Sequence, residues 1–157
     1  MDTNTFYAVT SATCFALVGL WWTVVKDRPE WFKDEAMKRV AGGVLLSFLI
    51  PALMSMGAQV GIDTPFLWQL VFVIAAGTGI IFSARLVRSA KRINLAGWYG
   101  KNSWVVPILY AGVLFFALFP GLAGLFGLQP LQLEGLLLTV LVLAGHLLAW
   151  EFIFRPV

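Results

Sequence analysis

The chain carries little charge. Only 12% of its 157 residues are Asp, Glu, Lys or Arg, about half the share in a soluble domain. Cys14 is the only cysteine, which excludes an intrachain disulfide and a cysteine-based metal cage. The H-E-x-x-H, G-x-S-x-G and P-loop motifs are also missing. The sequence therefore shows no machinery for hydrolysis or phosphoryl transfer, and we expect a protein that is not an enzyme.

What the chain has in abundance is apolar sequence. Hydrophobic residues make up 60% of it, and they gather in five stretches of the length that crosses a bilayer as a helix, about 20 residues each. These stretches leave no room for a soluble domain. We predict an all-α integral membrane protein, a five-transmembrane-helix bundle forming a single membrane domain over 1–157. The predicted spans are 6–25, 40–60, 66–87, 104–126 and 131–154.

The basic residues are confined to three of the six polar segments. All 11 Lys and Arg residues lie between the first and second spans, between the third and fourth, or after the fifth. Lys and Arg stay on the cytoplasmic side during insertion. The pattern predicts the N-terminus outside, the C-terminus cytoplasmic, and a location in the cell inner (plasma) membrane.

The segment between the first two spans contains helix signals. Asp27 and Glu30 form a D-x-x-E capping pattern, which predicts a short interfacial helix over Pro29–Arg39 with Trp31 and Phe32 in lipid. The alternative is a solvated linker helix that continues into the second span. Asn94–Asn102 is rich in glycine and asparagine and is predicted to be a loop.

A second group of basic residues follows the third span as a short amphipathic extension. Its members are Arg85, Arg88, Lys91 and Arg92. The net charge of +3 is clustered beside apolar spans, which favours anionic lipid headgroups of the cytoplasmic leaflet over nucleic acid as the partner. We therefore predict a lipid-binding role for these four residues and no nucleic-acid partner.

Small or polar residues recur every fourth position in three of the spans. Such rows allow helix backbones to approach closely in lipid, so they predict packing seams inside the bundle. The alternative interpretation is a polar path through the membrane. The rows are Ala8, Ala12, Ala16, Gly19 and Thr23 in the first span; Gly43, Ser47, Pro51, Ser55 and Gln59 in the second; and Ala75, Gly79 and Ser83 in the third.

The fifth span carries a polar row on an otherwise apolar helix. Gln132, Thr139 and His146 recur every seventh position and so share one face. His146 is the only histidine, and an ionisable group at that depth is a candidate functional residue. We expect it to face protein or a cofactor rather than lipid. As a packing residue it bonds a helix backbone or a Ser or Thr of a neighbouring span; as a functional residue it ligates a tetrapyrrole, binds a quinone or carries a proton.

The C-terminal segment Ala144–Val157 resembles the C-terminal part of bacterial light-harvesting antenna polypeptides. In that family a histidine after a small residue ligates bacteriochlorophyll, and an Arg-Pro-aromatic sequence follows. Here Val142 stands where the family has a small residue, and Val157 replaces the closing aromatic residue. The family also has one span and the opposite orientation, so the resemblance bears on His146 alone.

These features lead to two expectations about function. The first is a non-catalytic accessory or scaffold subunit of a larger bacterial inner-membrane complex of respiratory or photosynthetic type. It would pack against partner transmembrane subunits and anionic lipid, with one tetrapyrrole or quinone held at His146. The alternative is a small homo-oligomeric channel or carrier whose polar path is lined by the second and fifth spans.

Overall fold

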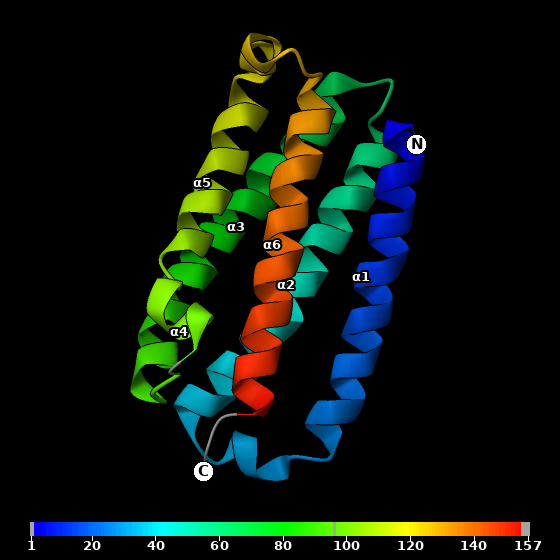
Figure 1. Ribbon diagram of the computed structural model, residues 1–157. Coiled ribbons are helices and arrows are strands. Elements are labelled where there is room, and N and C mark those ends of the chain that lie inside the picture. Colours follow the sequence, from blue (N-terminus) through cyan, green and yellow to red (C-terminus); the bar gives the residue numbers. More distant parts are fainter. Residues whose placement is uncertain (1, 96, 155–157) are drawn as a thin grey trace.

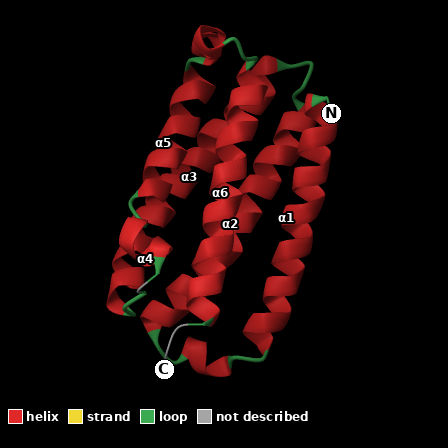
Figure 2. Ribbon diagram, viewed as in Figure 1, coloured by secondary structure: helices red, strands yellow, loops and turns green. Residues whose placement is uncertain are grey.

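The computed structural model describes residues 2–95 and 97–154, and this part of the chain is an all-helical bundle without a strand. The long helices run side by side and are joined by short turns (Figures 1 and 2). In chain order the elements are α1 (Thr3–Lys26), η1 (Pro29–Phe32), α2 (Glu35–Val60), α3 (Pro65–Arg92), α4 (Trp98–Asn102), α5 (Val105–Leu118), η2 (Pro120–Phe126) and α6 (Pro130–Ile153).

Four of these helices, α1, α2, α3 and α6, are long and apolar enough to cross a membrane. They lie at the positions of four of the predicted spans, with ends that differ by at most five residues. The membrane helix α1 starts at Asp2, whose side chain accepts a hydrogen bond from the Thr5 amide at 2.7 Å. This bond favours the charged carboxylate and lowers the pKa of Asp2.

The fourth predicted span is wrong as a single straight helix. The helix α5 ends at Leu118, and η2 follows after a bend of 105°. Phe119 has a non-helical backbone, and Pro120 cannot continue the α5 ladder because it lacks an amide hydrogen. The pair counts as a fifth span only if α5 and η2 are taken together as one broken segment.

The helix α2 forms the middle of the bundle. It packs against α1, α3 and α6, while α5 packs against α3 and α6 (Figure 1). All described Lys and Arg residues lie near the lower end in Figure 1, where α1 and α3 end and α2 begins. We call it the basic end, and we call the other end, which holds the N-terminus, the opposite end.

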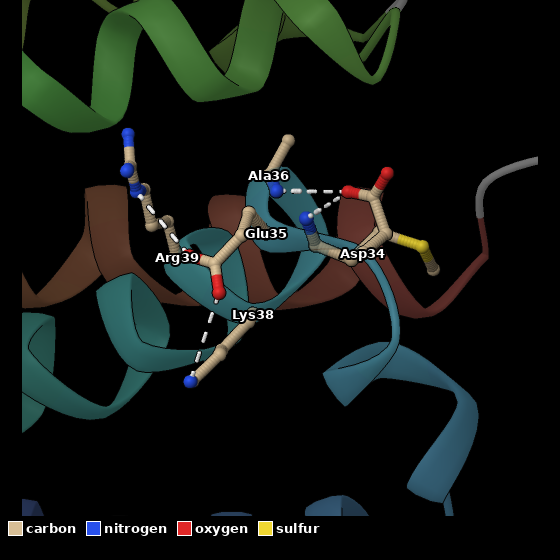
Figure 3. Close-up of polar contacts among 6 residues, drawn as sticks. Asp34, Glu35, Ala36, Lys38 and Arg39 are labelled. Carbon is tan, nitrogen blue, oxygen red and sulfur yellow. Dashed lines mark hydrogen bonds and ion pairs between the residues drawn. The ribbon is translucent and has the colours of Figure 1, made fainter.

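The predicted short helix over Pro29–Arg39 is two elements instead. Residues 29–32 form the 3₁₀ turn η1, and α2 begins at Glu35, so only residues 35–39 continue into the second long helix as the alternative expected. Asp34 caps α2 by accepting hydrogen bonds from the amides of Ala36 and Met37, each at 2.8 Å (Figure 3). The helix starts here because this carboxylate satisfies two amides that have no partner inside the helix.

Trp31 does not lie in lipid. Its ring is 6% exposed, stacks on Trp21 with centroids 5.9 Å apart, and contacts Phe152 at 4.4 Å. Trp21 also donates from Nε1 to the carbonyl oxygen of Ala41 at 2.9 Å. This aromatic cluster ties η1 to three long helices at the basic end. Phe32 is exposed, as expected for a residue in contact with lipid.

The predicted loop Asn94–Asn102 contains the short helix α4. Glu151 of α6 caps it: one carboxylate oxygen accepts from the Tyr99 amide and the other from the Gly100 amide at 3.0 Å. Position 100 has to be glycine, because a Cβ there would collide with the carbonyl oxygen of Leu95. Burial, and secondarily the nearby Glu151 carboxylate, raise the pKa of Tyr99.

Candidate functional site at the basic end

Four arginines surround a cleft of about 520 Å³ between α2 and α3 at the basic end. We call it the arginine cleft. Its lining residues come from the first turns of α2 and from the last three turns of α3. They are Arg39, Phe82, Arg85, Leu86, Arg88, Ser89 and Arg92.

Helix geometry explains which of the predicted lipid-binding residues meet in the cleft. Arg85, Arg88 and Arg92 are spaced by three and four positions, so they lie on one face of α3. Lys91 does not line the cleft. The structure therefore brings together three of the four predicted residues, together with Arg39.

Sequence reasoning did not assign Arg39 to this site. The signal that could have found it is the antiparallel arrangement of the second and third spans, which places the start of one beside the end of the other. Figure 3 shows the Arg39 side chain extending from α2 towards the green ribbon of α3. Its Nε lies 4.0 Å from a Glu35 carboxylate oxygen, and this carboxylate also lies 3.8 Å from Nζ of Lys38.

The positive charge of the arginine cleft is largely uncompensated by the protein. No carboxylate lines it. Among the described residues, Arg85, Arg88 and Arg92 form no ion pair with an acidic side chain. Like charges three or four positions apart on a helix destabilise each other. An anion in the cleft would relieve this repulsion.

The row of α2 that is predicted to be a packing seam lies largely inside the bundle. Gly43, Pro51 and Ser55 are buried, and Ser47 and Gln59 are half-buried. A Cβ at Gly43 would lie 2.6 Å from Cδ1 of Leu86, which shows how closely α2 approaches α3.

The described residues leave little space for a polar path beside the row of α2. The cavity beside Gly43 and Ser47 measures only about 20 Å³, which is too small for a continuous column of water. The polar side chains bond within their own helix: Ser47 donates to the carbonyl oxygen of Val44 at 2.7 Å, and Gln59 to that of Ser55 at 3.2 Å.

The row of α1 faces out of the bundle, which differs from the predicted internal seam. The helix instead buries Tyr7, Ser11, Cys14, Trp21 and Val25. The exposed row consists of Ala8, Ala12, Ala16, Gly19 and Thr23.

The polar row of α6 also lies on the bundle surface. Gln132, Thr139 and His146 are all exposed. Thr139 donates to the carbonyl oxygen of Gly135 at 2.9 Å, and Nδ1 of His146 lies 2.9 Å from that of Val142. The Gln132 side chain accepts from the Gln129 amide in a capping box. The three residues share a face as predicted, but each bonds only near its own place on α6.

The hydrogen bond of His146 goes to the backbone of its own helix and not to a Ser or Thr of another span. Its ring meets that of Phe48 edge-on, with centroids 5.0 Å apart. Within this chain the remaining ring nitrogen, Nε2, has no hydrogen bond to a described residue, so it is the atom on which a ligand would bind.

Glu134 is a buried residue whose position the sequence did not indicate. As the fifth residue of α6 it is fully buried, and neither carboxylate oxygen has a hydrogen-bond partner among the described residues. The start of α6 is capped by Gln129 and Gln132 and not by Glu134.

Comparisons with protein-family models, with curated proteins and with solved structures found no match to this chain. Its function therefore has to be inferred from the arrangement of its residues.

Proposed function

We propose that the protein is a non-catalytic accessory subunit of a larger assembly in the bacterial inner membrane. In this proposal the outward faces of α1 and α6 pack against a transmembrane helix of another subunit. The basic end faces the cytoplasm and binds anionic lipid. One tetrapyrrole or quinone binds at His146, between this chain and its partner.

The observation that carries the proposal is the outward polar row of α6. Polar groups in hydrocarbon are costly unless they are bonded, and membrane proteins normally turn them towards other helices. Gln132, Thr139 and His146 do the opposite within this chain. A partner helix that carries hydrogen-bonding side chains would complete their bonds and remove them from lipid.

The exposed small row of α1 supports the same proposal. A Cβ at Gly19 would meet nothing within 4 Å. Rows of small residues in membrane helices allow another helix to approach closely. No other helix of the described residues covers the row, so in this proposal the helix that packs on it comes from another chain.

A photo-crosslinking amino acid at Thr139 tests this proposal in the native membrane. We expect it to capture one other polypeptide, whereas the same amino acid at Ile81, an exposed apolar residue of α3, captures lipid. A covalent homodimer at Thr139 would favour the homo-oligomer instead. Capture of lipid alone at both positions would contradict the docking role.

The proposed ligand at His146 has its own test. Protein purified from the native membrane should carry a visible absorption band or an extractable quinone. His146→Phe should lose it, whereas the neighbouring change Thr139→Val should keep it. Parent protein with neither ligand would contradict this part of the proposal and leave helix docking in place.

The orientation is tested by labelling single cysteines in a Cys14→Ser background. Asp63→Cys at the opposite end should react with an impermeant reagent added to whole cells, and Lys101→Cys at the basic end should not. The reverse result would place the basic end outside.

A further inference from the structure

We propose that the arginine cleft binds one phosphate-bearing group with at least two negative charges, held between α2 and α3. This inference deepens the proposed function: it names the ligand class at the basic end, and it rests on that proposal only in placing the cleft at a lipid surface. It differs from a diffuse attraction to anionic lipid because it assigns specific residues from two helices and leaves Lys91 out.

The arginine side chains of the cleft favour a phosphate group as the ligand. A guanidinium group presents a planar fork of donors that matches two oxygens of a phosphate or carboxylate. Arg85, Arg88 and Arg92 supply three such groups along one wall, and Arg39 supplies a fourth from α2. A tetrahedral phosphate can accept donors from several directions at once, so it suits arginines that converge from two helices.

The positive charge of the cleft favours a ligand with more than one negative charge. Among the described residues, Glu35 is the one acidic side chain that forms an ion pair with an arginine of the cleft, and that arginine is Arg39. The three guanidinium groups on α3 have no carboxylate partner in this part of the chain. A ligand with a single negative charge would leave most of this repulsion in place, whereas one with two or more charges would relieve it.

The size and lining of the cleft suit a phospholipid. The cleft measures about 520 Å³ and includes the apolar side chains of Phe82 and Leu86. Phe82 precedes the arginines along α3 and Leu86 lies between Arg85 and Arg88, so the wall is apolar at its inner end and more basic towards the helix end. A phospholipid has the same order, with acyl chains followed by phosphate. A soluble diphosphate would use the arginines alone.

The probes are cardiolipin, with two phosphodiesters, phosphatidylglycerol, with one, and inorganic pyrophosphate. Each is titrated against detergent-purified full-length protein and followed by native mass spectrometry. We expect cardiolipin to bind at least about fivefold more tightly than phosphatidylglycerol, as one extra paired charge near such a surface implies. Stronger binding of pyrophosphate than of cardiolipin would identify a soluble diphosphate as the source of the phosphate.

The variants that test the geometry are Arg39→Gln and Arg88→Gln, with Lys91→Gln as the matched control. All three remove one positive charge from an exposed position at the same end. Each arginine variant should weaken binding of the preferred probe about fivefold, and Lys91→Gln should change it less than twofold. Arg39→Lys should recover only part of the loss, because lysine lacks the fork.

Two results would overturn the inference. One is an equal loss for Lys91→Gln and Arg39→Gln, which would show that only overall charge matters. The other is absence of any preference for doubly charged probes. Unchanged melting temperatures of the variants exclude unfolding as the cause. Crosslinking at Thr139 is measured on the same variants, so failure of the cleft and failure of the proposed docking role give different results.

Discussion

Among the described residues, the side-chain hydrogen bonds that join separate elements come from groups that point into the bundle, whereas outward groups bond within their own helix. The Tyr7 hydroxyl donates to the Leu131 carbonyl oxygen at 2.7 Å, and Gln69 donates to that of Ala117 at 3.1 Å. Inward groups can also bond within their own helix, as Ser47 does. Outward groups bond within their own helix, as Thr78 does with Ile74 at 2.8 Å.

The contrast shows that a polar row on a membrane helix does not reveal by itself whether its face points into or out of the bundle. An outward group that bonds its own backbone avoids the full cost of an orphan polar group in lipid. It also remains free to exchange that bond for one to a partner. The rows of α2 and α1 look alike in sequence, yet one is the central seam of the fold and the other faces out.

The largest effect should come from filling the inner seam. A Cβ at Gly79 would lie 2.5 Å from the Tyr110 ring, so Gly79→Leu forces α3 away from α5. We expect a loss of about 3 kcal/mol and a much lower melting temperature in detergent. Leu137→Ala, at a half-buried position of α6, should cost less. Equal melting temperatures would show that the seam is loosely packed.

Much of the fold could be predicted because it depends on features local in sequence. Long apolar runs predicted four of the helices. The Lys and Arg residues lie in alternate polar segments of the sequence, and the described ones gather at one end of the bundle. The bend at Phe119 was missed because proline near the end of an apolar run is compatible with a kinked helix as well as with a broken one.

The next effect concerns the inward carboxylate that closes the basic end. Glu151→Ala removes the acceptor for the amides of Tyr99 and Gly100 and leaves the start of α4 uncapped. We expect a local cost of about 1–2 kcal/mol, seen as faster amide hydrogen exchange over residues 97–102. Glu151→Gln keeps one acceptor oxygen and should lie between the two. Unchanged exchange in the alanine variant would show that the loop is held by other contacts.

The candidate sites were harder to predict because they depend on which residues meet across helices. The pattern on the third span gave Arg85, Arg88 and Arg92 but could not exclude Lys91 or supply Arg39. Periodicity placed His146 on a shared face, but not which way the face points, because α6 is apolar on both of its other sides. The burial of Glu134 gives no signal in a single sequence, since a carboxylate near a helix start is common.

Glu134 is an inward group without a hydrogen-bond partner among the described residues, as is the Ser55 hydroxyl. An unpaired buried carboxylate is costly and has to take up a proton to remain there, whereas an amide of similar shape is already neutral. The free energy of unfolding of Glu134→Gln should therefore equal that of the parent or exceed it by up to about 1 kcal/mol. Its melting temperature should be the same or higher. The control is Glu151→Gln, which alters an inward carboxylate that has partners and should melt lower. A clear loss of stability in Glu134→Gln would mean that the carboxylate has a partner, such as a bound cation.

The smallest effect on the isolated chain should come from the outer row. A Cβ at Gly19 would meet nothing within 4 Å, so Gly19→Leu should change the stability of the purified protein by no more than about 0.5 kcal/mol. The same change would project a bulky side chain from a face that a partner helix has to approach closely. In the native membrane it should therefore lower the yield of the Thr139 crosslink, although the purified protein folds normally.

Leu20→Ala, at an exposed bulky position beside Gly19, is the control that does not add bulk. If Gly19→Leu leaves the crosslink intact, α1 is covered by lipid alone and only α6 contacts a partner. If it destabilises the purified chain, the row packs inside the fold, and the distinction between inner and outer rows fails for α1.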